Sequence, residues 1–154
     1  MNNIVNQSKL VAALAGLTIT VLAWAQDSDI DAAKQFFAQY AALENAYDPG
    51  LADLYADAAL IRQTRKMPMG EPKDVIVPAP KYKTMLRQSI AMARERGDRS
   101  NYSDVTYTRE GEFVRIDAMR FSEMNKRTNP FRIVVGQSPS GEWLIYEEVS
   151  ASRM

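Results

Sequence analysis

The sequence contains neither cysteine nor histidine among its 154 residues. Without cysteine, the chain can form no disulfide framework and can carry no lipid on a cysteine. Without histidine, there is no imidazole to ligate a metal, to activate a Ser or Cys nucleophile, or to titrate near neutral pH. Acid–base chemistry would have to use carboxylates and phenols, and we expect no metal and no cofactor.

An excess of charge of either sign is also absent, because 19 basic residues balance 19 acidic ones. This balance argues against nucleic acid as a partner. The distribution is nevertheless uneven, since the charged residues in 26–60 are mostly acidic and those in 61–99 are mostly basic. We favour compensation between the two segments within the molecule; the alternative is a basic face for an anionic ligand, a lipid headgroup or an acidic partner.

The first 25 residues have the pattern of a secretory signal peptide. A polar start with one cation, Lys9, leads into the uncharged apolar stretch 10–25, and the small residues Ala23 and Ala25 precede polar Gln26. The pattern predicts cleavage after Ala25 and a periplasmic or secreted protein. The apolar stretch is shorter than the roughly 20 residues that span a bilayer. We therefore expect no stable membrane anchor after cleavage, with an uncleaved N-terminal anchor as the alternative.

The remaining residues, 26–154, have the length of one domain. Helical spacing of apolar residues predicts a helix from about residue 29 to 46, a short helix after Pro49, and an amphipathic helix from 81 to 96 that ends at Gly97. Alternating patterns predict strands at 58–64, 102–108, 113–124, 131–137 and 143–149, with a brief one at 74–77. The last four strands should form an antiparallel meander. Helices followed by an antiparallel sheet indicate the α+β class, with the helices on one face.

Two stretches carry a resemblance to a known family. The first runs from Phe37 through Tyr40 and Asp48 to Ile61, and the second is the run 141–145, Gly-Glu-Trp-Leu-Ile. They resemble the helical hairpin with first strand, and the last strand, of the nuclear transport factor 2-like (NTF2-like, SnoaL-like) superfamily. The resemblance implies a cone-like, curved antiparallel sheet wrapped around N-terminal helices, also called cystatin-like, with an interior cavity. It also implies that homodimers through the sheet are common.

Relatives in that superfamily include ketosteroid isomerase, scytalone dehydratase, polyketide cyclases and many proteins without chemistry, so the fold does not decide the function. Relatives with a histidine in the last strand often use it in the cavity, and Glu147 stands near that position here. Strand alternation places Glu147 with Trp143 and Ile145 on the face toward the helices. There it could act as a general acid or base, or it could be a carboxylate at the rim paired with an arginine.

Residues 113–124 have no cleanly apolar face, and a bulge could exchange the two faces midway. Asp117 and Arg120 are therefore candidates for the cavity, with surface positions or a structural ion pair as the alternative.

Tyr40 and Tyr55 lie on the expected buried side of the helical hairpin. There a phenol can fill apolar space and also offer its hydroxyl to a ligand.

Three functions remain open from the sequence. The first is an exported, non-catalytic domain that binds a small, partly apolar molecule through Tyr40, Tyr55, Arg120 and Glu147. The second is an isomerase, dehydratase or cyclase in which Glu147 or Asp117 moves a proton and a tyrosine hydroxyl stabilises an enolate-like oxygen. The third is an interaction module that uses the outer face of the sheet or the basic helix 81–96.

Overall fold

The computed structural model describes residues 15–65 and 69–151. Residues 1–14, which belong to the expected signal peptide, lie outside this range. All the expected helices and strands are present, most of them longer than the sequence pattern indicated. In chain order the elements are α1 (Ala15–Asn45), the 3₁₀ helix η1 (Pro49–Leu54), β1 (Tyr55–Arg65), β2 (Lys73–Pro78), α2 (Ala79–Arg96), β3 (Ser100–Glu110), β4 (Phe113–Ser122), β5 (Arg127–Gln137) and β6 (Trp143–Ala151).

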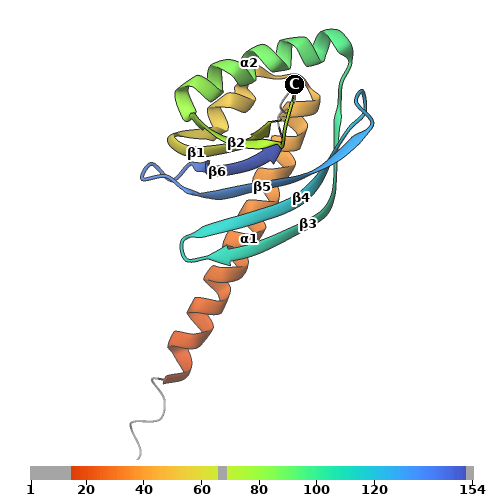
Figure 1. Ribbon diagram of the computed structural model, residues 1–154. Helices are drawn as coiled ribbons and strands as arrows, with labels where there is room; N and C mark the ends of the chain where they lie inside the picture. The colour runs from red at the N-terminus through yellow and green to blue at the C-terminus, as the bar shows by residue number, and fades with distance from the viewer. Residues whose placement is uncertain (1–14, 66–68, 152–154) are drawn as a thin grey trace, which may run out of the picture.

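The six strands form one curved, unclosed sheet in the order β2-β1-β6-β5-β4-β3 (Figure 1). Strands β3 to β6 form the expected antiparallel meander. Strand β1 pairs antiparallel with β2 and parallel with β6, so the sheet is mixed. The first and last strands of the chain are therefore neighbours in the middle of the sheet.

The two helices cover opposite halves of one face of the sheet. Helix α1 packs on β3 and β4, whereas α2 packs on β1, β2 and η1. Figure 1 shows α2 above β1 and β2, while α1 crosses the other end of the sheet. The inner face of β5 and β6 therefore lies between the two helices, where it is covered by side chains from both sides.

Helix α1 begins earlier than the sequence pattern indicated. It starts at Ala15, so residues 15–25 of the expected signal peptide and the first helix of the domain are one continuous helix. Its contacts with the domain include an ion pair of 2.6 Å between Asp29 and Arg109 of β3. Among its side chains that the structure describes, from residue 28 onward, Ala33 is the first that is fully buried. No helix in the described part of the chain combines the length and the hydropathy needed to cross a membrane.

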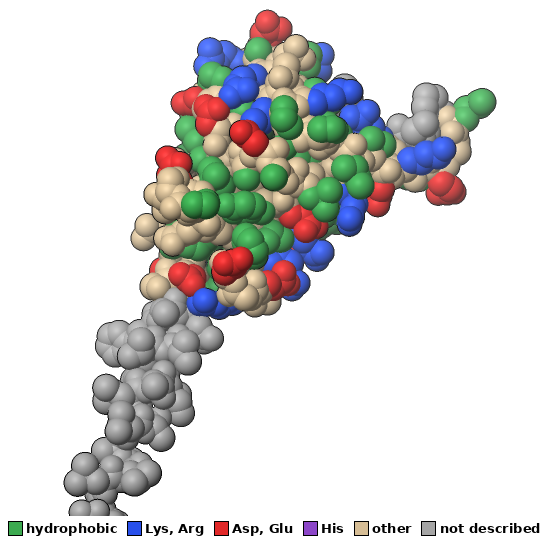
Figure 2. Space-filling model, turned by 90° about the vertical axis from the view of Figure 1, so that its left-hand side faces the viewer, with side chains coloured by type: hydrophobic (Ala, Val, Ile, Leu, Met, Phe, Trp, Pro, Cys, Tyr) green, Lys and Arg blue, Asp and Glu red, His purple; other side chains and the backbone are tan. Residues whose placement is uncertain are grey.

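Ion pairs link the acidic segment of the chain to the basic one. Lys83 of α2 lies 2.6 Å from Asp57, and Arg87 lies 2.6 Å from Asp53. On the face shown in Figure 2, acidic and basic side chains lie among one another instead of forming separate areas. These contacts support compensation within the molecule, and they use two of the cations on the helix that we considered as a docking surface.

Candidate functional site

Strand β6 contains a bulge at Tyr146 that decides which carboxylate enters the core. Ile145 pairs with Val135 of β5, but Glu147 pairs with the preceding residue, Val134, so Tyr146 has no partner of its own. Such an extra residue exchanges the faces of the strand beyond it. Ile145 and Glu148 are accordingly both 0% exposed on the inner face.

Our expectation that Glu147 faces the helices is therefore wrong. Glu147 lies on the outer face, next to Val134 of β5 and Leu60 of β1, and is only half-buried. Simple alternation along β6 led to this error, because it holds only where each residue has one partner across the strand pair. The carboxylate on the inner face belongs to the next residue, Glu148.

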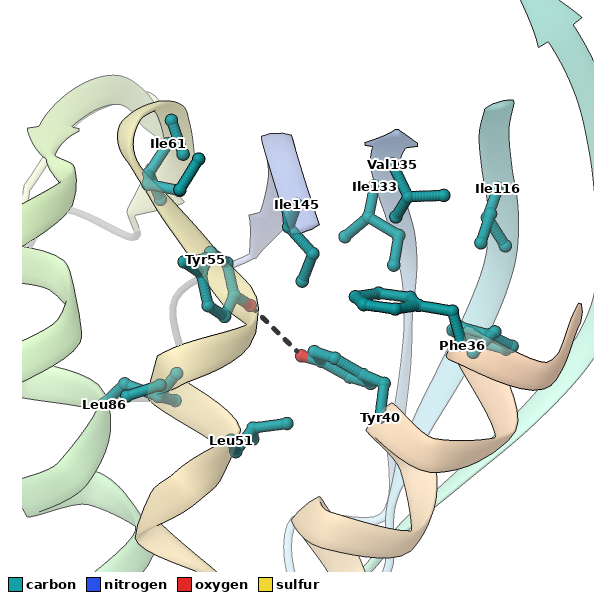
Figure 3. Close-up of a cluster of buried hydrophobic side chains, with 14 of the residues drawn as sticks. Phe36, Tyr40, Leu51, Tyr55, Ile61, Leu86, Ile116, Ile133, Val135 and Ile145 are labelled. Carbon is teal, nitrogen blue, oxygen red and sulfur yellow. Dashed lines mark hydrogen bonds between the residues drawn. The ribbon is translucent and has the colours of Figure 1, made fainter. Parts of the chain in front are cut away.

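Three hydroxyl groups donate hydrogen bonds to the buried Glu148 carboxylate, and a fourth hydroxyl lies next to one of them. Tyr55 donates a hydrogen bond to Oε2, while Tyr82 donates to Oε1 over 2.9 Å and Ser150 donates to Oε1 over 2.6 Å. The Tyr40 hydroxyl lies 3.4 Å from that of Tyr55, as the dashed line in Figure 3 marks. We call these five residues the Glu148 cluster; they come from α1, β1, α2 and β6.

The Glu148 cluster lies within apolar surroundings. Figure 3 shows Tyr55 and Tyr40 pointing toward each other among Ile145, Ile133 and Leu51. In such surroundings a hydrogen bond is stronger than in water, and an unpaired polar group is more costly. The hydroxyl donors thus replace the water that a surface carboxylate would bind.

No Lys or Arg of the described residues forms an ion pair with Glu148, so hydroxyl groups alone stabilise the carboxylate. Burial raises the pKa of Tyr55 well above its ordinary value, and the charge of Glu148 and the neighbouring Tyr40 and Tyr82 raise it further. Tyr55 is therefore a protonated hydrogen-bond donor at neutral pH. The arrangement can bind polar groups of a ligand, or hold and move a proton between phenol and carboxylate.

Arg120 lies on the inner face of β4, in a second group of polar side chains. Burial alternates along β4 without a break, and its pairing with β5 is continuous. The Nη1 atom of Arg120 lies 4.0 Å from Oε1 of Glu44 on α1, and the guanidinium lies over the Phe131 ring at 5.8 Å. Tyr102 donates a hydrogen bond of 2.5 Å to Oε2 of Glu44. We call these four residues the Arg120 cluster.

Asp117 lies on the outer face of β4, between two arginines. Its carboxylate accepts hydrogen bonds from Arg115 over 2.8 Å and from Arg132 over 2.6 Å. Burial by itself would raise the pKa of Asp117, but the hydrogen bonds and charges of Arg132 and Arg115 outweigh it, so that the pKa is lowered. The structural ion pair that we considered as the alternative is present. The bulge that we allowed for in β4 is absent from its pairing with β5, and the extra residue of the β3–β4 pair lies in β3, between Ser103 and Thr106.

The structure thus places Tyr40, Tyr55 and Arg120 on the inner face, and Glu147 and Asp117 on the outer face. The sequence reading missed Glu148, Tyr82, Ser150 and Glu44. A signal existed for two of them: Tyr82 lies on the apolar side of its helix, and Glu44 follows Tyr40 by four residues and so shares its helical face. In the described ranges, no three acidic side chains are grouped so that they could hold a metal ion.

No family model matches the sequence, and no curated protein matches it either. Solved structures do match its fold. An NTF2-like protein with a cystatin-like fold from Novosphingobium aromaticivorans is 15% identical, with a TM-score of 0.58 over 94% of this chain and 92% of that one. A candidate dehydratase of the NTF2-like family from Streptomyces avermitilis is 12% identical, with a TM-score of 0.61 over 84% of this chain and 99% of that one.

A third structure, of a protein from Catenulispora acidiphila in complex with S-DNPA, is 15% identical, with a TM-score of 0.54 over 82% of this chain and 92% of that one. At such identities the likeness concerns the fold alone. The order of the elements, the curved mixed sheet and the helices on its inner face all agree with that likeness. The chain therefore has the NTF2-like, cystatin-like fold.

Proposed function

We propose that this domain binds a small, partly apolar molecule at the inner face of its sheet and catalyses no reaction on it. The observation that carries the proposal is the Glu148 cluster, a set of buried hydrogen-bonding groups at the inner face of β6, where side chains of both helices meet. Small-molecule sites in proteins have this composition, with an apolar lining and a few placed polar groups that orient the ligand.

The polar groups of the cluster suggest how a ligand would be held. A carboxylate has about four lone-pair positions, and Glu148 uses three of them for the hydroxyls of Tyr55, Tyr82 and Ser150. The remaining position can accept a ligand hydroxyl or amide N–H, while the hydroxyl of Tyr40 can bind a ligand carbonyl. The complex of the Catenulispora acidiphila protein with S-DNPA gives one case of a small molecule recorded with a protein of this fold.

A thermal-shift screen of small, partly apolar compounds tests the proposal. A ligand at about 100 times its dissociation constant stabilises the folded state by about 2.7 kcal/mol, which is readily seen as a higher melting temperature. We expect hits whose effect is lost in Glu148→Gln and kept in the matched control Glu147→Gln, because only Glu148 lies inside. A screen without hits, or hits that both variants retain, would contradict binding at this site.

A second candidate function is proton transfer on such a ligand, and the hydrogen bond between Tyr55 and Glu148 favours it. The residues named from the sequence, Glu147 and Asp117, lie on the outer face, so the base in this proposal is Glu148, the buried carboxylate that accepts the Tyr55 hydrogen bond. Once Glu148 has taken the ligand proton, it would donate that proton to the Tyr55 oxygen in a hydrogen bond, and the Tyr55 hydroxyl hydrogen could then turn to an enolate-like oxygen and stabilise it. Exchange of an α-hydrogen of a ketone in deuterium oxide, followed by NMR, tests this function. Exchange that Glu148→Gln abolishes would support it, and no exchange above the buffer rate would argue against it.

We also propose that the protein is exported and cleaved after Ala25, on the strength of the n-region, the apolar stretch and the small residues before Gln26. The intact mass of the protein recovered from a secreting bacterial host tests this proposal. We expect the mass of a chain that begins at Gln26. The mass of a chain that keeps residues 1–25 would instead favour the N-terminal anchor. The ion pair between Asp29 and Arg109 lies beyond this point, so cleavage would preserve it.

A homodimer through the outer face of the sheet is a further proposal from the sequence. Its support is that Ile76 on β2 is 62% exposed and Leu60 on the adjacent β1 is 39% exposed, so that two large apolar side chains lie on the outer face of neighbouring strands. Light scattering should give twice the mass of the chain, and Ile76→Lys should lower it to that of a monomer. A wild-type protein that is monomeric at high concentration would refute the dimer.

A further inference from the structure

Arg120 is a buried cation whose hydrogen-bonding capacity is not used up by the fold. Its side chain is 8% exposed, and its Nη1 atom has no hydrogen-bond acceptor among the described residues. Oε1 of Glu44 lies 4.0 Å away, which balances charge but is too long for a hydrogen bond. A buried donor of this kind costs free energy until an acceptor reaches it.

The backbone holds Arg120 and Glu44 in this arrangement from both sides. Asn45, next to Glu44, exchanges two hydrogen bonds of 2.9 Å with the backbone of Ser100 and so ties the end of α1 to the start of β3. On the sheet, Tyr102 of β3 pairs directly with Arg120 of β4. The backbone segments that carry Arg120 and Glu44 are therefore tied together, and their side chains face each other at 4.0 Å without a hydrogen bond.

The charges around Nη1 restrict which acceptor fits. The cation already faces one carboxylate, that of Glu44, and a second full negative charge would be repelled by it at close range in a poorly solvated region. An uncharged acceptor takes the N–H hydrogen bond without this repulsion. A carbonyl oxygen is such an acceptor, and a hydrogen bond from a charged donor to it is stronger than one between neutral groups.

The rings near Arg120 restrict the rest of the ligand. The centroid of Phe131 lies 5.5 Å from that of Tyr102 and 5.6 Å from that of Tyr40, and the ring of Phe37 lies 5.1 Å from that of Tyr102. Such a lining favours flat apolar groups, which stack on ring faces or meet their edges. Phe131 belongs to β5, the middle strand adjoining β6, so these rings lie beside the Glu148 cluster.

We propose that Arg120 selects the ligand by donating its Nη1–H to an uncharged carbonyl oxygen on an aromatic or alicyclic body, and that Glu44 excludes the corresponding carboxylates. This inference rests on the proposed function and adds the chemical class of the ligand. The Glu148 cluster and the Arg120 cluster then bind different parts of the same molecule, with the rings of Tyr40 and Phe131 between them.

Three probes of the same shape test the inference: acetophenone, benzoate and ethylbenzene, titrated into the purified protein and followed by two-dimensional NMR. In the wild type, acetophenone should bind about tenfold more tightly than ethylbenzene, because it gains one charge-assisted hydrogen bond. Benzoate should bind more weakly than both. Arg120→Lys keeps the charge but loses the planar donor, so the tenfold preference should disappear. Glu44→Gln keeps an acceptor for Tyr102 but removes the negative charge, so benzoate should become the tightest of the three.

The outcomes separate this inference from the proposed function. If compounds bind and depend on Glu148 but the order of the three probes is the same in the wild type and in Glu44→Gln, the site exists and the role of Arg120 is refuted. If neither the probes nor the screened compounds bind the wild type, both proposals fall. Should Arg120→Lys fail to fold, Glu44→Gln alone tests the inference. If the three probes bind this variant in the same order of affinity as the wild type, Arg120 and Glu44 form a structural pair only.

Discussion

Tyr55 and Glu148 are 93 positions apart in the chain, and the hydroxyl of the first donates a hydrogen bond to the carboxylate of the second inside the core. The two side chains are 1% and 0% exposed. They come from β1 and β6, which are far apart in sequence but adjacent and parallel in the sheet. This contact links the first and last strands through side chains as well as through the backbone.

Replacing Glu148 by alanine should lower the free energy of unfolding by about 3 kcal/mol, because the hydroxyls of Tyr55, Tyr82 and Ser150 lose their common acceptor in the core. Urea unfolding followed by circular dichroism measures the change. The adjacent Glu147→Ala is the matched control and should change stability by about 0.5 kcal/mol or less, because that side chain lies on the outer face. Equal losses in the two variants would contradict the exchange of faces at the Tyr146 bulge.

Stability should fall in alkaline solution because the pKa of Tyr55 is raised in the folded state. A group whose pKa is higher when folded contributes stability that is complete below its unfolded value, here 10.0, and that is lost as the pH rises toward the folded value. Urea unfolding at a series of alkaline pH values should show this decline. Tyr55→Phe should make it shallower, whereas an unchanged decline would mean that other groups cause it.

The opposite dependence is expected in acid from Asp117. Its pKa is lowered in the folded protein, so its contribution is complete above the unfolded value of 3.8 and is lost as the pH falls through the folded value. Asp117→Asn should flatten the acid limb of a plot of unfolding free energy against pH. At neutral pH this variant should cost less than Glu148→Ala, because the Asp117 side chain is 30% exposed and solvent screens its ion pairs. An acid limb as steep as in the wild type would refute this role.

Replacing Asn45 by alanine should detach the end of α1 from β3. The change removes the two hydrogen bonds to the backbone of Ser100, and we expect a loss of about 2 kcal/mol in unfolding free energy. Hydrogen exchange at the Ser100 amide should become faster. Gln88→Ala, at an exposed amide on α2, is the control and should leave that exchange rate unchanged. A slow Ser100 amide in Asn45→Ala would show that α1 is held there by packing alone.

Much of the fold follows from local sequence signals. The stop after α2 lies at Gly97, whose φ of 66° is left-handed and suits glycine, and the turn between β3 and β4 lies at Gly111, with the same φ. Such positions separate the periodic stretches, so the order of helices and strands could be predicted. The pairing of β1 with β6 could not, because it brings together residues that have no local relation in the chain.

In the candidate site, too, some features could be predicted from the sequence and others could not. The pattern predicted that Tyr40 and Tyr55 lie on the buried side of the helical hairpin. Both are buried, but Tyr55 is the first residue of β1 and not part of a helix. Their roles in binding, like that of Arg120, remain predictions. Glu148 was missed because Glu147 and Glu148 are chemically identical neighbours, and only the pairing of β6 with β5 determines which of them points inward.

The sequence by itself determined the order of the elements, the α+β class and the exclusion of thiol and imidazole chemistry, because these depend on composition and on periodicity over a few residues. The tertiary structure decided which carboxylate is buried, that hydroxyl groups stabilise it, and that Arg120 faces Glu44. Those facts depend on an extra residue in one strand and on contacts between residues far apart in the chain. A one-residue shift in strand pairing exchanges the two faces of a strand, and no local pattern in β6 specifies that shift.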